Sequence, residues 1–278
     1  AGVFLAFAGA MLGLVITDNT LIMYMFWELT TVFSFLLIGH YSGRGSSRRA
    51  ARQAIIVTTA GGLAMLVGLI MLGEMNGGSY SLAGIVESAQ AGSLGAGQGA
   101  LLPAAAVLVL IGAFSKSALF PFHFWLPAAM AAPTPVSAYL HAAAMVKAGV
   151  YLVARLAPGL SYLTQWQWMV TVAGVTTLLI GGYSALKQND LKLVLAFGTV
   201  SQLGLITIMV GYGDSEVALA GLMLLCAHAL FKSTLFLTVG IIDASFGTRD
   251  LRELSGAGRA MPAIAVFAGL ATASMVGL

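Results

Sequence analysis

Long apolar stretches, separated by short polar connections, run through the whole chain. Each is close to the roughly 20 residues that a helix needs to cross a bilayer, and none alternates with the period of two typical of a membrane barrel strand. The stretches cover residues 1–17, 20–39, 54–73, 101–120, 134–155, 166–185, 191–211, 217–242 and 261–278. Because unpaired backbone groups cannot face lipid, the pattern predicts an all-α, polytopic transmembrane helical bundle with about nine spans in a single membrane domain, residues 1–278. Apolar stretches at both termini indicate a segment that is truncated at both ends.

The polar connections differ in charge on the two sides of the predicted bundle. Lys and Arg gather in the connections 40–53, 186–192 and 243–260, which fall on one side, and Lys192 is counted among them. The opposite connections hold no Lys or Arg, apart from Arg155 at the end of its span. By the positive-inside rule the basic connections are cytoplasmic, so the chain enters the membrane from the cytoplasm.

Two stretches deviate from simple spans. The Gly- and Ser-rich connection 74–100 is expected to hold a short interfacial helix around 81–89. Four of the seven prolines lie close together, at Pro121, Pro127, Pro133 and Pro135. Since proline removes a backbone donor and clashes with the preceding turn, the helix that runs into Phe120-Pro121 is predicted to break there. Broken helices at membrane depth line polar cavities.

Composition excludes several classes of protein. With 59% hydrophobic and 8% charged residues, the chain lies far from the soluble average of about a quarter charged. A net charge of +3 with scattered basic residues gives no nucleic-acid footprint, and a single cysteine, Cys226, allows neither an intrachain disulfide nor a cysteine metal site. The sequence holds no phosphate-binding loop and no dinucleotide fingerprint, so no cofactor or metal is expected. Haem on His141 or His228 is a weaker alternative.

Four charged residues lie inside apolar stretches, at Glu28, Lys116, Lys147 and Lys232. Each costs about 2.5 to 3.5 kcal/mol if it stays ionised at the centre of a bilayer. One interpretation is a static buried ion pair, or side chains that snorkel to an interface. The other is a hydrated interior path on which these groups exchange protons, because the charge of a lysine responds to burial and to a nearby carboxylate. Three lysines cannot all pair with the one acid, Glu28, which favours the second interpretation.

Two histidines extend this set. His141 lies six residues before Lys147 in one stretch, and His228 lies four residues before Lys232 in another, which places that pair on one helix face. Histidine changes charge near neutral pH and can pass protons. The candidate proton-translocating residues are therefore Glu28, Lys116, His141, Lys147, His228 and Lys232.

Three motifs carry a resemblance to a known family. They are GAFSKSA at Gly112–Ala118, FPFHFWLP at Phe120–Pro127 and APTPVSAYLH at Ala132–His141. With them the chain resembles the proton-translocating antiporter-like family, which includes large membrane subunits of respiratory complex I, related hydrogenase subunits and the Mrp antiporters. Within that family, Met145–Gly149, and Gly240–Asp243 followed by Gly247–Asp250, are more similar to the A-type Mrp subunit than to complex I.

The resemblance implies an architecture and a set of positions. The chain would run from the fourth helix to the start of the twelfth in an inverted-repeat fold, with 1–155 as a first five-helix unit and 162–278 as an incomplete second. All six candidate residues match charged or histidine positions of the family. The sequence departs from the family at Leu119, Ala128, Ala131 and Leu224, where relatives often carry Gln, Asp, Glu and His.

The resemblance also implies a function. The expected activity is that of an ion-translocating subunit of a multisubunit monovalent cation (Na⁺)/proton antiporter, multi-pass in a prokaryotic plasma membrane. Its partners would be other antiporter subunits, the lipid bilayer, protons and monovalent cations. The alternatives are a proton-pumping subunit of a redox complex, either NADH:quinone oxidoreductase or membrane hydrogenase, and a scaffold that does not transport.

Overall fold

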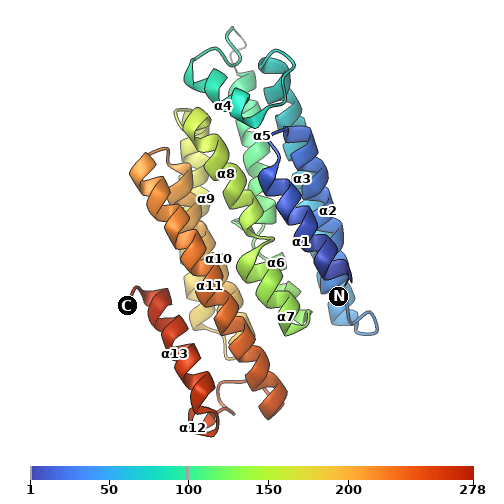
Figure 1. The fold of residues 1–278 in the computed structure, drawn as a ribbon, viewed down its shortest axis with the longest axis vertical. Coiled ribbons are helices and arrows are strands. Elements are labelled where there is room, and N and C mark those ends of the chain that lie inside the picture. Colours follow the sequence, from blue (N-terminus) through green and yellow to red (C-terminus); the bar gives the residue numbers. More distant parts are fainter. Residues whose placement is uncertain (1, 98–99) are drawn as a thin grey trace.

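The structure, a computed structural model, describes residues 2–97 and 100–278. Its helices stand side by side along one long axis (Figure 1). The helices are α1 (Gly2–Ile16), α2 (Thr20–Ile38), α3 (Gly45–Met75), α4 (Leu82–Gln90), α5 (Leu101–Lys116), α6 (Trp125–Ala128), η1 (Ala129–Ala131), α7 (Thr134–Ser137), η2 (Ala138–Ala143), α8 (Lys147–Leu160), α9 (Thr164–Leu186), α10 (Leu191–Gly211), α11 (Ser215–Phe246), α12 (Ala257–Ala260) and α13 (Pro262–Val276). Every predicted apolar stretch contains a helix, and the all-α bundle is confirmed.

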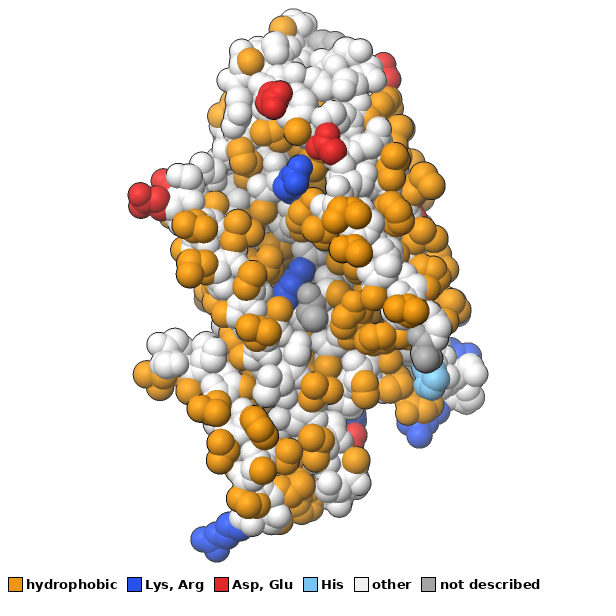
Figure 2. Space-filling view, in the orientation of Figure 1, with side chains coloured by type: hydrophobic (Ala, Val, Ile, Leu, Met, Phe, Trp, Pro, Cys, Tyr) orange, Lys and Arg blue, Asp and Glu red, His pale blue; other side chains and the backbone are white. Residues whose placement is uncertain are grey.

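Length separates the helices into two groups. Six helical segments are long and apolar enough to cross a membrane, with α7 through α8 counted as one segment. By contrast α1, α5 and α13 are apolar helices of 15 or 16 residues. Large apolar side chains are exposed on the sides of the bundle, for example Leu63 and Leu179, and Figure 2 shows apolar side chains over much of its surface. This surface suits contact with lipid or with other membrane helices.

Helix boundaries differ from the sequence prediction at polar ends. Helix α3 begins at Gly45 and not at residue 54, so Arg48, Arg49 and Arg52 lie on its first turns and not in a connection. Arginine is a good helix former, and a helix can project beyond the apolar region it crosses. The predicted short helix in the connection 74–100 is confirmed as α4, which begins after Ser81, whose Oγ accepts a hydrogen bond from Gly84 N at 3.0 Å.

Two short backbone bridges of the same design hold the turns that precede α2 and α10. At one end of the bundle, Thr20 N donates to Tyr80 O at 2.8 Å and Leu82 N donates to Asp18 O at 2.7 Å. At the other end, Leu191 N donates to Arg249 O at 3.0 Å and Leu251 N donates to Asn189 O at 2.9 Å. Each bridge is centred on the residue that caps the following helix, and the two lie at opposite ends of the long axis (Figure 1).

Helices α3 and α5 approach closely through glycine. A methyl group on Gly61 would lie 1.9 Å from Ser115 Oγ, so only glycine allows this approach. The contact brings the end of α5, with the adjacent Lys116, against both α3 and α2.

Candidate functional site

The first break in the bundle lies between α5 and α6. Helix α5 ends at Lys116, four residues before Phe120-Pro121, and helix structure resumes at Trp125, so the predicted proline-broken helix is confirmed. The freed backbone groups find partners inside the protein. Phe120 N donates to Thr177 Oγ1 at 2.8 Å, and Ser115 O accepts from Trp125 Nε1 at 2.9 Å. Such pairing is what allows irregular backbone at membrane depth.

A second break, which the sequence did not predict, interrupts the span 134–155. The segment η2 is a π-helix, Met145 N just after it donates to Leu140 O at 2.9 Å, and α8 begins only at Lys147. The predicted span is present within Thr134–Leu160, but it is interrupted. No proline lies between Val136 and Ala157, so the apolar pattern carried no signal for the break. π-Helical turns are frequent at functional sites.

Ser117 connects the two breaks. Its Oγ donates to Val146 O at 2.6 Å and accepts from Val150 N at 3.1 Å, so it bonds backbone groups on both sides of the start of α8. A methyl group on Gly149 would lie 2.1 Å from Ala113 O, which shows how closely α8 packs on α5. The end of α5 and the start of α8 therefore form one buried junction, with Lys116 and Lys147 on its two sides.

Lys116 is completely buried and is held by α2. Its Nζ donates to Trp27 O at 2.6 Å, to Thr30 Oγ1 at 2.5 Å and to Thr31 Oγ1 at 2.9 Å. The same atom lies 4.7 Å from the centre of the Trp27 ring.

Glu28 does not form an ion pair with Lys116. The two groups interact electrostatically, but within the described residues no nitrogen of Lys116 lies within 4.0 Å of the carboxylate, and Glu28 Oε1 has no hydrogen-bond partner. Three oxygens of α2 accept hydrogen bonds from the ammonium group in place of the carboxylate.

Lys147 and Lys232 also lie in the interior without a carboxylate. Lys147 is 7% exposed and its Nζ donates to Ala142 O, in the π-helical segment. Lys232 is 1% exposed, and its Nζ lies 3.5 Å from Leu195 O on α10. Among the described residues neither lysine forms an ion pair.

Both candidate histidines are fully buried, and none of their four ring nitrogens has a hydrogen-bond partner in the described part of the chain. His228 is influenced electrostatically by both Lys147 and Lys232. His141 instead interacts with the charge of Lys192. His228 and Lys232 are both buried on α11, and His141 lies in η2, before the interruption that precedes Lys147.

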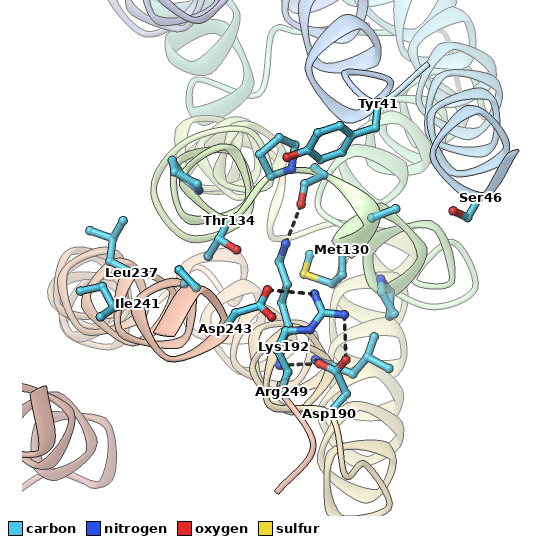
Figure 3. Close-up of a pocket in the computed structure, with 18 of the residues that line it drawn as sticks. Tyr41, Ser46, Met130, Thr134, Asp190, Lys192, Leu237, Ile241, Asp243 and Arg249 are labelled. Atoms are coloured by element: carbon cyan, nitrogen blue, oxygen red, sulfur yellow. Dashed lines mark hydrogen bonds and ion pairs between the residues drawn. The ribbon is translucent and has the colours of Figure 1, made fainter. Parts of the chain in front are cut away.

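The sequence prediction missed Lys192, which it placed in a basic connection. Lys192 lies on the first turn of α10, is 1% exposed, and its Nζ donates to Ala132 O at 2.6 Å. Apolar residues follow it directly, which was the available signal. It lines a cavity of about 900 Å³ beside Asp190, Asp243 and Arg249, and Arg249 pairs with Asp190 at 3.1 Å and with Asp243 at 3.9 Å (Figure 3).

This arrangement suits the handling of protons. Amines, imidazoles and a carboxylate that lie inside a bundle without counter-charges can change protonation when a neighbour does. Over residues 2–97 and 100–278, no three His, Cys, Asp or Glu side chains are grouped so as to hold a metal ion.

Comparison with known proteins gives consistent matches. The family described as "NADH:quinone oxidoreductase/Mrp antiporter, TM" matches residues 17–278. A probable K⁺/H⁺ antiporter subunit of Rhizobium meliloti, of the A/B type, is 50% identical over 99% of this chain and 27% of its own length. An Na⁺/H⁺ antiporter subunit of Bacillus subtilis, of the A type, is 48% identical over 99% of this chain and 35% of its own length.

A solved structure of the Mrp complex from Dietzia sp. DQ12-45-1b is also similar. The similarity covers all of this chain and 30% of the chain in the complex, with a TM-score of 0.92 and 41% identity. The chain thus spans about a third of the length of these relatives.

Proposed function

The chain belongs to the NADH:quinone oxidoreductase/Mrp antiporter membrane family, and from this premise we propose that it is the ion-translocating part of a monovalent cation/proton antiporter subunit. The proposal places it as a multi-pass protein in a bacterial plasma membrane, assembled with other antiporter subunits. The two relatives at 50% and 48% identity carry names with different cations, K⁺ and Na⁺, so the proposal extends to the class of monovalent cations.

The observation that carries the proposal is the state of the interior lysines. Lys116, Lys147 and Lys232 are all buried, and each bonds neutral oxygens in place of a carboxylate. A buried lysine without counter-charge costs several kcal/mol and adds nothing to stability. Such groups are retained where their charge changes during function, which argues against the static ion pair and the scaffold.

The same lysines suggest how protons move. A neutral amine accepts a proton at Nζ, and the added charge disfavours protonation of its neighbours. His228 on α11 is exposed to the charges of both Lys147 on α8 and Lys232 on α11, and Glu28 and Lys116 form a second group. Moving one charge across 100 mV is worth about 2.3 kcal/mol, the same scale as a change of one to two units in a pKa. The membrane potential is therefore large enough to shift such groups.

We favour the antiporter over a redox-driven pump. The family description includes both, but the similarity to the Mrp complex extends over the whole chain at 41% identity. Both curated relatives described above are named as antiporter subunits.

We also propose that 1–155 and 162–278 are the two units of an inverted repeat. The matching bridges at Asn19 and Asp190, at opposite ends of the bundle, support this division. In an experimental structure of the full-length protein, the two units should superpose by a twofold axis in the membrane plane. Superposition only by an axis along the membrane normal would contradict it.

Transport by charge variants of the full-length assembly tests the proposed function. Lys116→Ala and Glu28→Gln should each abolish the ΔpH that Na⁺ or K⁺ generates across inverted vesicles, because each removes a group that changes charge. Lys187→Ala and Glu87→Gln, at exposed positions, serve as matched controls and should transport at the native rate. Native transport by both interior variants would refute the proposal.

A further inference from the structure

We propose that the cavity of about 900 Å³ beside Lys192 binds the headgroup of an anionic phospholipid. Such a lipid would stay in place and not be transported, so the site lies outside the proposed function. Three features of the cavity carry the proposal: its place in the bundle, the charges in its wall and the apolar side chains at its border (Figure 3).

The cavity lies where basic connections of the chain come together. Its wall includes Arg44 from the connection between α2 and α3, Asp190 from that between α9 and α10, and Arg249 from that between α11 and α12. The positive-inside rule places these connections on the cytoplasmic side, next to the headgroups of that leaflet. Anionic headgroups bind in basic pockets between membrane helices on this side.

Cationic side chains outnumber anionic ones in the wall of the cavity. The cations are Arg44, Lys192 and Arg249, and the anions are Asp190 and Asp243. Arg249 pairs with the two carboxylates, at 3.1 Å and 3.9 Å. Within the described residues, neither Arg44 nor Lys192 forms an ion pair. The wall therefore carries one net positive charge, which a headgroup with a single negative charge would neutralise.

The two cations without a carboxylate would act on a phosphate in different ways. Arg44 is exposed, and its guanidinium lies 4.7 Å from the centre of the Tyr41 ring. A guanidinium stacked on a ring keeps the N–H groups at its edge available for a phosphate. Lys192 is 1% exposed and donates to Ala132 O, so it contributes its charge from within the wall. Away from water that charge is weakly screened and attracts an anion in the cavity.

The start of α3 adds a further feature that favours an anion. Arg44 is the N-cap residue of this helix of 31 residues, and its side chain does not cap the first amide groups. Ser46, on the first turn, lines the cavity. Amide groups without intrahelical partners and the helix dipole both stabilise a negative group at such an end. A phosphate here would accept hydrogen bonds from the helix end and from Arg44 together.

The border of the cavity on α11 is apolar. Leu237 and Ile241 line it, and they are 49% and 43% exposed. They lie four residues apart and therefore form one strip along the helix, on the other side of the cavity from Ser46 (Figure 3). An acyl chain would cover this strip, whereas a free phosphate ion has no use for it. The combination of a cationic wall and an exposed apolar border therefore favours a phospholipid over inorganic phosphate.

Electron cryomicroscopy of the full-length assembly in lipid nanodiscs tests the site. One sample contains phosphatidylglycerol, whose headgroup carries a single negative charge, and another contains phosphatidylcholine, whose headgroup carries no net charge. We expect density for a headgroup in the cavity, with its phosphate beside Arg44, only in phosphatidylglycerol. A third sample, in detergent with inorganic phosphate and no added lipid, should show no density at this position.

Charge variants test which groups hold the lipid. Native mass spectrometry of the assembly counts the phosphatidylglycerol molecules that remain bound. Arg44→Gln and Lys192→Met should each lower that number by one for every copy of this chain. Arg44 is exposed and methionine fills the space of the buried Lys192, so both variants should assemble. The matched controls Arg49→Gln and Lys187→Met remove exposed charges that do not line the cavity, and they should keep the native number.

Four results would overturn the proposed lipid site. They are a cavity in phosphatidylglycerol that is empty or filled by protein, equal headgroup density in phosphatidylcholine, phosphate density in the sample without lipid, and a native number of bound lipids in both cavity variants. None of these measurements depends on transport. Failure of the proposed function is recognised separately, by native transport in Lys116→Ala and Glu28→Gln.

Discussion

Two interior lysines of this chain, Lys147 and Lys192, are held by carbonyl oxygens that lie at interruptions of helices. Lys147 bonds Ala142 O, at the end of the π-helical segment, and Lys192 bonds Ala132 O, just before α7. Carbonyl groups at helix ends lack intrahelical partners and need donors. Each interruption therefore supplies an acceptor for an ammonium group without the permanent charge of a carboxylate.

Ser117 is the residue whose loss should weaken this junction most directly. Ser117→Ala would leave Val146 O and Val150 N without their partner, at a cost of about 1 to 3 kcal/mol. We expect a lower unfolding temperature in detergent, measured by intrinsic fluorescence. Ser233→Ala is the matched control, because that hydroxyl bonds only Ala229 O of its own helix. Equal unfolding temperatures for the two variants would contradict the claim that Ser117 stabilises the junction.

The burial of the candidate residues could be predicted from sequence, but not their partners. A lysine within an apolar stretch indicates an interior charge, and this was enough for Lys116, Lys147 and Lys232. Neighbours in sequence were a poor guide to neighbours in space. His141 and Lys147 were assigned to one stretch, and the structure separates them by the interruption between η2 and α8.

Individual elements differ in how clearly the sequence indicates them. Prolines predicted the break after α5, because their effect on a helix is local. The break before α8 has no such signal, since its backbone is satisfied by tertiary contacts such as that of Ser117. The start of α3 was also misplaced, because charged residues close to a membrane surface are compatible with both helix and connection.

The bridge that precedes α2 should give the turn a measurable pH dependence. The hydrogen bond from Ser81 Oγ, with that from Ala83 N and the charge of Arg155, lowers the pKa of Asp18 below its ordinary 3.8. A lowered pKa stabilises the folded state above the unfolded value, and this contribution is lost as the pH falls through the folded value. The difference in unfolding temperature between the native protein and Asp18→Asn should therefore be full at neutral pH.

The same difference should shrink as the pH falls below about 3.8. Thermal unfolding in detergent at a series of pH values measures it. Asp214 caps α11 at an exposed position. The variant Asp214→Asn therefore shows how much of the change in unfolding temperature comes from helix capping alone. A difference in unfolding temperature between the native protein and Asp18→Asn that stays constant with pH would contradict the lowered pKa of Asp18.

Across the whole molecule, the charged interior and the apolar exterior have separate roles. Apolar side chains cover much of the outside (Figure 2), and the cavity of about 900 Å³ opens beside Lys192 near one end of the bundle (Figure 3). Inside the bundle, His141 lies in η2, Lys147 on α8, and His228 and Lys232 on α11, and all four are buried. The central claim is that these buried groups carry protons during transport.

Cation-dependent ΔpH in vesicles that contain the full-length assembly with Lys232→Ala tests this claim most directly. The account predicts that this variant loses transport while Lys187→Ala, which removes an exposed lysine, transports at the native rate. A Lys232→Ala assembly that is present at the native level and transports at the native rate would contradict it.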